Sequence, residues 1–281
     1  MSETAWTLHT GDCREVLRTL EAGSVDAVIC DPPYAEIDRA YGRLSETAWA
    51  TLMHDIVSHL RRTLKPSGSA MLVLQPNSEH VGKMRPWVWD FLSWCCREWN
   101  VIQDAYWWNH TAFPTVGASR RYGLLRPSLK YCIWLGAPDC YRDQAAVLWE
   151  ASATTKGWSL EDRLMRYNPS GAHNRPGRAC ATALERGGVT PFNVLPLANT
   201  DSMHSAGALG HGAGTPLALC RWWVRYLCPP GGTVLDPFSG SASTGVAALR
   251  EGRRYVGIEQ DARYADASRQ RLAVEQLALG R

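Results

Sequence analysis

Apolar and polar residues alternate along both ends of the chain in a way that predicts strands followed by helices. The first 30 residues predict a strand, a helix and a buried strand, at residues 6–10, 13–20 and 25–30. From Ser45 to Leu64 apolar residues recur at the spacing of one helix face, and Ser45 is a residue type that caps helices. The sequence KPSG ends this helix, and the run at residues 69–75 predicts another strand.

The last quarter of the chain repeats this order of elements. It predicts a strand, a helix ended by glycine, a strand and a long helix, at residues 231–236, 241–252, 253–259 and 262–279. Strands that alternate with helices favour an α/β fold with a parallel sheet covered on both faces. The pattern weakens between residues 87 and 210, where arginine, glycine and proline interrupt it. We expect residues 137–210 to be an insertion on one edge of the sheet.

Composition is that of an ordinary globular protein, with 45% hydrophobic and 20% charged residues in a chain of 281. This length suits one large α/β domain. No apolar stretch approaches the ~20 residues that cross a membrane, and the start lacks the pattern of a signal peptide, so we expect a cytoplasmic protein. The nine cysteines include no Cys-x-x-Cys pair, which argues against a zinc ribbon or a disulfide framework. No metal site is expected.

The distribution of charge is more informative than the net charge of +3. Residues 105–138 and 163–184 contain no acid, and basic and aromatic residues are interleaved in the first of these tracts. Such tracts favour a surface that faces nucleic-acid phosphates, with a solvated basic face as the alternative. The candidate phosphate contacts are Arg120, Arg121, Arg126, Lys130, Arg175 and Arg178.

The sequence VLDPFSGSASTG, at residues 234–245, predicts a strand that runs into a small-residue turn and a helix. Glu259 ends the next strand, 23 residues after Asp236. This is the layout of a site for an adenosine-containing cofactor, in which the second acid binds the ribose hydroxyls. Asp236 would repel a pyrophosphate but suits a ligand with an ammonium and a sulfonium. The motif therefore favours S-adenosylmethionine over a dinucleotide.

The sequence DPPY, from Asp31 to Tyr34, follows the strand at residues 25–30. Together with the cofactor motif and with TGDCREVL at residues 10–17, it resembles the amino-methylating DNA methyltransferases of bacteria and phages. The motif order, DPPY first and cofactor motif last, is that of their β-class. The resemblance covers residues 7–135 and 204–280.

This resemblance implies a Rossmann-like methyltransferase fold with a mostly parallel seven-stranded sheet and a permuted motif order. It divides the chain into a catalytic half at residues 1–136, a target-recognition insertion at 137–210 and a cofactor-binding half at 211–281. It also implies S-adenosyl-L-methionine as cofactor and double-stranded DNA as partner. A homodimer and a cognate restriction endonuclease are left open.

The DPPY residues suit the methylation of an exocyclic amine, which is a poor nucleophile. The Asp31 carboxylate and the Pro32 carbonyl can each accept one N–H and so orient the nitrogen. Pro32 and Pro33 fix the backbone and lack N–H groups. Tyr34 offers a flat face to a base that has left the duplex.

By resemblance, further residues belong to the cofactor pocket: Asp12, Phe238, Gly240, Glu259, Thr215 and Pro216. Two of these residues have an alternative, purely structural role. Asp12 could cap the following helix, and Phe238 could pack in the core. Two residues depart from the family pattern. Thr215 replaces a lysine before the proline, and Ala242 replaces a glycine of the cofactor turn, which narrows the expected pocket.

The leading hypothesis is methylation of adenine at N6, because an aspartate at the start of the motif is commoner with adenine in this family. Methylation of cytosine at N4 is the alternative, since both amines pose the same chemical problem. An enzyme that methylates RNA or a protein amide, and a DNA-binding relative without activity, are further alternatives. The absence of a PCQ-like nucleophile at Cys228 argues against methylation of cytosine at C5.

Overall fold

The computed structural model describes residues 5–38, 42–110, 121–151, 166–167, 173–174, 182–199 and 214–280. The chain forms two compact units. One comprises Met1–Arg142 and Asn193–Arg281, and the other comprises Asp143–Phe192. Every strand of the main sheet belongs to the first unit.

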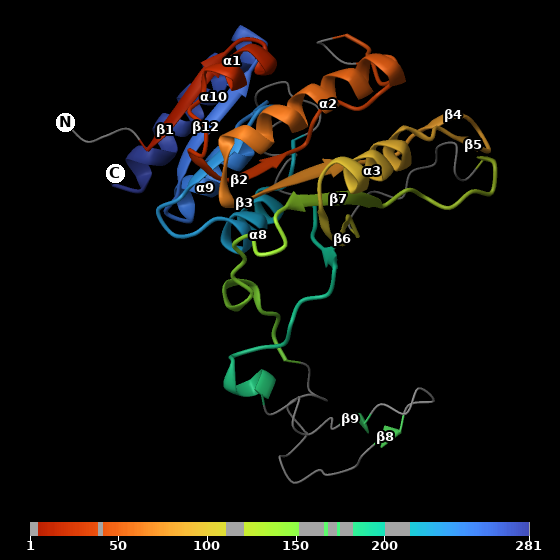
Figure 1. The fold of residues 1–281 in the computed structure, drawn as a ribbon, viewed down its shortest axis with the longest axis vertical. Coiled ribbons are helices and arrows are strands. Elements are labelled where there is room, and N and C mark those ends of the chain that lie inside the picture. The colour runs from red at the N-terminus through yellow and green to blue at the C-terminus, as the bar shows by residue number, and fades with distance from the viewer. Residues whose placement is uncertain are drawn as a thin grey trace. The chain divides into compact units, whose positions relative to one another are not determined.

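Within the described residues, the main sheet has eight strands in the order β1-β12-β11-β2-β3-β7-β6-β10 (Figure 1). Along the chain these are β1 Trp6–Thr10, β2 Val25–Cys30, β3 Leu64–Leu74, β6 Val101–Trp108, β7 Leu129–Gly136, β10 Val194–Pro196, β11 Thr233–Asp236 and β12 Arg254–Glu259. All neighbouring pairs are parallel except those that β7 makes with β3 and β6. The α/β class and the mostly parallel sheet are confirmed.

The count of seven strands is wrong by one, because β10 adds a three-residue strand beside β6. Three residues are too few for periodicity to reveal. β10 lies in the segment expected to be an insertion, and the compact unit there is the shorter Asp143–Phe192. It contains the 3₁₀ turn η1 Ala145–Val147 and the two-stranded pair β8 Arg166–Tyr167 and β9 His173–Asn174.

Two layers of helices cover the sheet (Figure 1). The helices α1 Cys13–Thr19, α2 Glu46–Thr63 and α3 Trp87–Glu98 form one layer, and α8 Leu217–Leu227, α9 Ser243–Arg250 and α10 Ala262–Ala278 form the other. A small hairpin of β4 Ser78–His80 and β5 Lys83–Met84 connects β3 to α3. Of the helices described, none is long and apolar enough to cross a membrane.

Local sequence explains the elements near the site. All six residues of β2 are buried, as expected for a central strand covered on both faces. The hydroxyl of Ser45 accepts a hydrogen bond from the Ala48 N–H and caps α2. The apolar face of α2 then packs into the main core, and Trp49 is fully buried there.

Candidate active site

Three carboxylates lie at the carboxyl ends of adjacent parallel strands. Glu259 ends β12, Asp236 ends β11 and Asp31 follows β2. Although about 200 residues separate their sequences, β11 and β2 are hydrogen-bonded neighbours. The chain leaves β2 through α2 towards β3, and leaves β11 through α9 in the opposite direction towards β12. Open α/β sheets bind their ligands at such a divergence of strand order.

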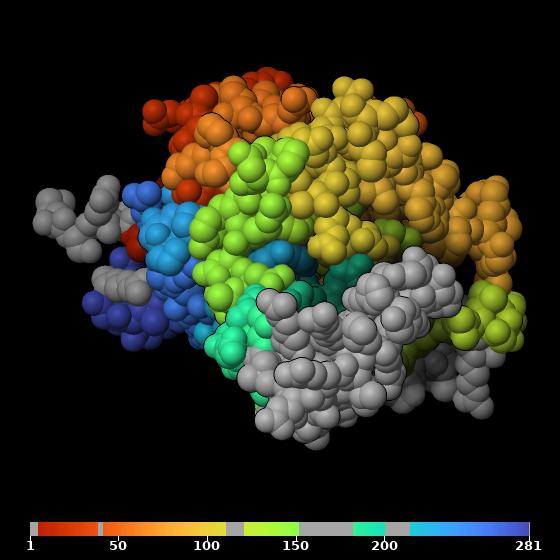
Figure 2. All heavy atoms as spheres, turned by 60° about the horizontal axis from the view of Figure 1, so that its bottom comes forward, coloured from red at the N-terminus to blue at the C-terminus, as the bar shows by residue number. Residues whose placement is uncertain are grey.

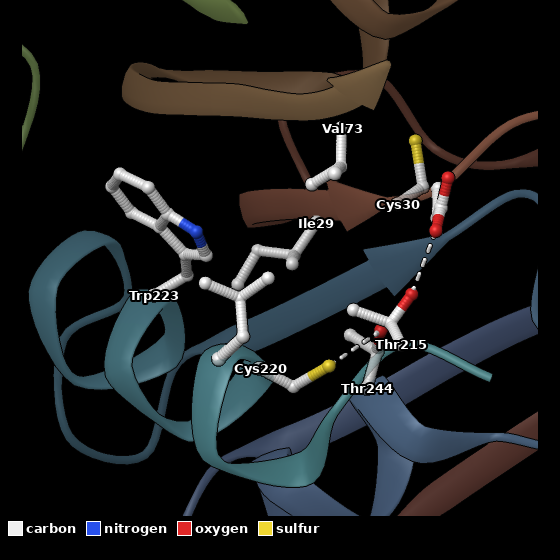
Figure 3. A pocket seen from close by; sticks show the side chains of 9 residues that line it. Ile29, Cys30, Val73, Thr215, Cys220, Trp223 and Thr244 are labelled. Carbon is white, nitrogen blue, oxygen red and sulfur yellow. Dashed lines mark hydrogen bonds between the residues drawn. The ribbon is translucent and has the colours of Figure 1, made fainter. Parts of the chain in front are cut away.

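A small pocket lies at this divergence. Figure 3 shows Thr215, Cys220 and Thr244 facing the ends of the sheet strands, with Cys30 and Ile29 on the other side. Cys220 Sγ lies 3.8 Å from the hydroxyl oxygen of Thr244. The remaining lining residues are Asp31, Val73, Leu219 and Trp223. The pocket therefore joins the DPPY turn to the starts of α8 and α9.

Three side chains donate hydrogen bonds to the Asp31 carboxylate. The hydroxyl of Tyr34 donates to Oδ1 at 2.7 Å. Oδ2 accepts from the hydroxyl of Thr215 at 3.0 Å and from the ammonium of Lys130 at 3.2 Å. Thr215 lies 184 residues after Asp31 in the sequence, so this hydrogen bond joins segments from the two ends of the chain.

Two side chains, the buried Trp49 and the partly buried Asn77, hold the backbone of the DPPY turn and of the residue that follows it. The indole N–H of Trp49 donates to the Pro33 carbonyl at 2.5 Å. Asn77 donates to the Ala35 carbonyl at 2.6 Å and itself accepts from Trp87 at 3.0 Å. By contrast, no described residue donates a hydrogen bond to the buried Pro32 carbonyl. The turn is therefore fixed while one of its carbonyls stays available.

Lys130 lies in this corner because β7 is antiparallel to β3, so that the start of β7 reaches the carboxyl edge of the sheet. Its ammonium lies 5.3 Å from the centre of the Tyr34 ring and 4.9 Å from that of the Trp107 ring. The Trp107 ring is fixed by its own hydrogen bond to the Leu197 carbonyl at 2.9 Å. The corner is thus an ion pair enclosed by aromatic faces.

Asp236 is buried beside this corner. Burial raises the pKa of its carboxyl to about 7, the N–H of Phe238 and the hydroxyl of Thr244 lower it in part, and the nearby Asp31 and Glu259 raise it further. The Phe238 N–H donates to it at 3.0 Å. Among the described residues, no cation forms an ion pair with Asp236. A buried acid without a cationic neighbour suits a ligand that brings its own positive charge.

The turn after β11 is joined to the end of β12. Glu259 accepts the N–H groups of Gly240 at 2.8 Å and of Asp261 at 2.9 Å. Gly240 and Ala242 both have positive φ, 50° and 57°. The turn therefore needs a left-handed conformation at Ala242, which explains why glycine is usual there and shows that this chain accepts local strain.

Three other predicted residues have structural contacts that bear on their alternatives. Asp12 caps α1 by accepting the Arg14 N–H at 2.8 Å, and its pairing with the Arg14 side chain lowers the pKa of its carboxyl. Phe238 is partly buried and packs against the main core. Pro216 is buried just before α8, and its carbonyl accepts the N–H of Cys220. A role towards cofactor remains a prediction for all three.

The predicted phosphate contacts divide into three groups. Arg121 and Arg126 are exposed in the segment that precedes β7, which lies beside the β4–β5 hairpin (Figures 1 and 2). Lys130 lies in the Asp31 corner. The others, Arg120, Arg175 and Arg178, lie outside the described residues. In the part of the chain that the structure describes, no cluster of ligating residues could hold a metal ion.

Sequence reasoning missed the residues that support the turn. In the sequence, Trp49 is one of the apolar residues that recur between Ser45 and Leu64, and nothing marks it as a donor to the turn. The pairing of Lys130 with Asp31 depends on the direction of β7. A weak signal did exist for Asn77, a polar residue just after the carboxyl end of a predicted strand. Polar residues in that position are candidates for a site in any parallel sheet.

Comparison with known proteins matches this chain to one family. A family model described as DNA methylase, of the N6/N4 type, matches residues 25–270. Among curated proteins, the chain is 24% identical over 273 residues to the DNA adenine methyltransferase YhdJ of Escherichia coli (strain K12), covering 96% of this chain and 83% of that protein. It is 23% identical over 276 residues to the type II methyltransferase M.PvuII of Proteus hauseri, covering 93% and 82%.

Two solved structures share the fold. The structure called PvuII DNA methyltransferase (cytosine-N4-specific) gives a TM-score of 0.71 at 20% identity, covering 98% of this chain and 93% of that one. The structure of TTHA0409 from Thermus thermophilus, complexed with S-adenosyl-L-methionine, gives a TM-score of 0.59 at 22% identity, covering 96% and 95%.

Proposed function

Because this chain belongs to the N6/N4 DNA methylase family, whose members use S-adenosyl-L-methionine, we propose that it methylates the N6 amine of a flipped adenine at a specific site in duplex DNA. The observation that carries this proposal is the Asp31 corner, where a carboxylate and a free backbone carbonyl lie next to the buried Asp236. The family establishes a DNA methyltransferase. The choice of base and the roles of individual residues are the proposed part.

The cofactor half fits the cofactor in charge and in shape. When bound, S-adenosylmethionine supplies an electrophilic methyl group on a positively charged sulfur. Asp236, buried and without a cation, would pair with the cofactor ammonium, and Glu259 would accept hydrogen bonds from the ribose hydroxyls. The pocket would be completed by Asp12, Phe238, Gly240, Thr215 and Pro216.

The DPPY turn would hold the amine. Asp31 and the Pro32 carbonyl each accept one N–H, which fixes the nitrogen and directs its lone pair away from the ring plane. The Asp31 carboxylate stabilises the positive charge that develops on nitrogen and accepts the proton that nitrogen must lose. The hydrogen bond from Trp49 to the Pro33 carbonyl supports this role, because it keeps the turn rigid while the amine binds.

The remaining roles concern the DNA. A base in a duplex cannot reach this corner, so it must leave the stack, and the ring of Tyr34 offers the face on which it would lie. Arg121 and Arg126 are exposed before β7 and carry no neighbouring acid in sequence, which supports contacts with phosphates. Arg120, Arg175 and Arg178 are proposed for the same role from the sequence alone.

The proposal of adenine rests on the aspartate at the start of the motif. Cytosine N4 is the second candidate, and the similarity of fold to a cytosine-N4-specific enzyme favours it. DNA from cells that express the protein, digested to nucleosides, should contain N6-methyladenine. Finding N4-methylcytosine alone would overturn the choice of base. Single-molecule sequencing of the same DNA would report the modified base and its target sequence together.

Asp31→Ala tests the mechanism. This variant should lose methylation by a factor of about 10³ or more, because it removes the group that orients and deprotonates the amine. Cofactor affinity should persist, measured by calorimetry. Glu275→Gln on α10 is the control, since it removes a carboxylate that pairs with Arg250 at the C-terminal end of α9, away from the Asp31 corner, and should leave methylation unchanged. Methylation at the normal rate in Asp31→Ala would refute the role of the carboxylate.

A further inference from the structure

Lys130 has contacts that differ from those of a phosphate-binding residue. Its ammonium is 3.2 Å from Asp31 Oδ2, and the two side chains are only 21% and 20% exposed. The faces of Tyr34 and Trp107 enclose the charge. A cation that contacts the DNA backbone would instead be exposed, as Arg121 and Arg126 are.

The hydrogen bonds on Asp31 limit what else can bind there. A carboxylate oxygen accepts about two hydrogen bonds in favourable geometry. Oδ2 already accepts from Lys130 and Thr215, and Oδ1 accepts from Tyr34. An amine that approached Oδ2 would meet an oxygen whose lone pairs are in use. The ammonium also neutralises the negative charge that the reaction needs when positive charge develops on the amine.

We infer that Lys130 is a positioning residue whose ammonium occupies the amine-binding corner of the free enzyme and is displaced when the target base enters. This inference rests on the proposed function and extends it. Like the amine of the base, the ammonium donates N–H to Asp31 beside an aromatic face. Because the lysine stem is flexible, it can withdraw without moving β7. Until then the ion pair keeps Asp31, Tyr34 and Trp107 together around the ammonium.

If Lys130 competes with the target base, a substitution that removes its charge should improve the binding of DNA. Lys130→Met keeps the length and apolar stem of the side chain but removes the competing cation. The KM for DNA should therefore fall about fivefold, the scale of one partly shielded ion pair. The kcat should change less than twofold, because the lysine has already left Asp31 in the reacting complex.

Lys130→Arg should act in the opposite direction. A guanidinium pairs with a carboxylate through two parallel N–H groups and is harder to displace than an ammonium. The KM should rise by a similar factor, again with little change in kcat. The order Met, Lys, Arg in increasing KM distinguishes displacement from a structural role, which would lower kcat and thermal stability in both variants.

The experiment measures steady-state methylation of unmethylated DNA with each variant at several salt concentrations, with thermal unfolding as a check on folding. Arg254→Met is the matched control, because Arg254 is exposed at the opposite, amino-terminal edge of β12. It loses the same charge and should keep the KM of the unaltered chain. If Lys130→Met does not fold, Lys130→Arg alone is the test, and a KM for DNA that does not rise in it would refute the inference.

The possible results distinguish displacement of Lys130 by the base from binding of a phosphate by Lys130. If Lys130→Met raises the KM and reduces the dependence of affinity on salt by about one ion, Lys130 binds a phosphate and the inference is wrong. An unchanged KM in both variants also refutes it, while normal methylation by the unaltered chain keeps the proposed function. If the unaltered chain methylates no DNA, the proposed function fails first and the inference falls with it.

Discussion

The titration of Asp236 should control the affinity for cofactor near neutral pH. Burial after β11 raises the pKa of this carboxyl to about 7, and Asp31 and Glu259, the charges that face it, raise it as well. In the cofactor-free protein the group is therefore half protonated at neutral pH. An ammonium placed beside it would stabilise the ionised form, so that binding at lower pH requires loss of a proton.

The size of the pH effect on cofactor affinity follows from the pKa of Asp236. At pH 6 about nine-tenths of the molecules carry a protonated Asp236, and at pH 8 about one-tenth do. The Kd for cofactor should therefore be about tenfold higher at pH 6 than at pH 8. Asp236→Asn should remove this dependence and give weak binding at both pH values.

The same pKa fixes the sign of a stability effect. The folded-state pKa lies above that of an unfolded aspartate, so the contribution of Asp236 to stability is fully present below about pH 4 and is lost as pH rises to about 7. The loss amounts to at most ~4 kcal/mol. Asp236→Asn should accordingly stabilise the cofactor-free protein at pH 8 while it weakens cofactor binding.

Calorimetry of cofactor binding at pH 6, 7 and 8 in two buffers of different ionisation enthalpy measures both the Kd and the protons released. Proton release at pH 6 that disappears in Asp236→Asn is the expected result. Glu275→Gln on α10 is the control, because it removes an acid that pairs with Arg250 away from the site. A constant Kd from pH 6 to 8, or an unaltered pH dependence in Asp236→Asn, would refute the reasoning.

Two further substitutions test the turns on either side of the site. Trp49→Phe removes the donor to the Pro33 carbonyl but keeps an aromatic ring. The kcat should fall about tenfold and the free energy of unfolding by ~1–2 kcal/mol, while the affinity for cofactor stays the same. An unaltered kcat would show that this hydrogen bond does not position the turn. Ala242→Gly relieves the left-handed backbone and should raise the unfolding free energy by ~1 kcal/mol, measured with denaturant, and tighten cofactor binding. A lower denaturation midpoint in that variant would contradict the assignment of strain.

Hydrophobic periodicity sufficed for the elements that hold the two motifs. The strands and helices predicted at the two ends of the chain correspond to β1, α1, β2 and α2, and to β11, α9, β12 and α10. It failed in the middle, where α3, β6 and β7 are regular elements although the pattern looked broken. Tryptophans explain this failure. Trp87 and Trp107 are buried on different elements while Trp89 is exposed, so tryptophan does not mark one face as leucine or valine does.

The residues that were foreseen at the site are those whose chemistry is local. Asp31, Asp236 and Glu259 each end or follow a predicted strand, and a parallel sheet places such positions on one edge. Contacts that depend on strand direction or distant packing were not foreseen. Lys130 reaches Asp31 only because β7 runs antiparallel to its neighbours, and no periodicity in residues 129–136 reports that direction.

The arrangement also explains how a chain can carry its catalytic motif first and its cofactor motif last. The proposed methyl transfer requires the carboxyl ends of β2 and β11 to be adjacent. Hydrogen bonding between these two strands makes them adjacent, whichever strand comes first in the sequence. Thr215, just before α8, donates to Asp31, so the cofactor half contributes directly to the corner that would hold the amine. Thr215→Ala would remove this donor and leave Lys130 and Tyr34 as the side chains that donate to Asp31. The cation that the family usually carries before the proline is absent at position 215, and the ammonium on Asp31 comes from β7 instead.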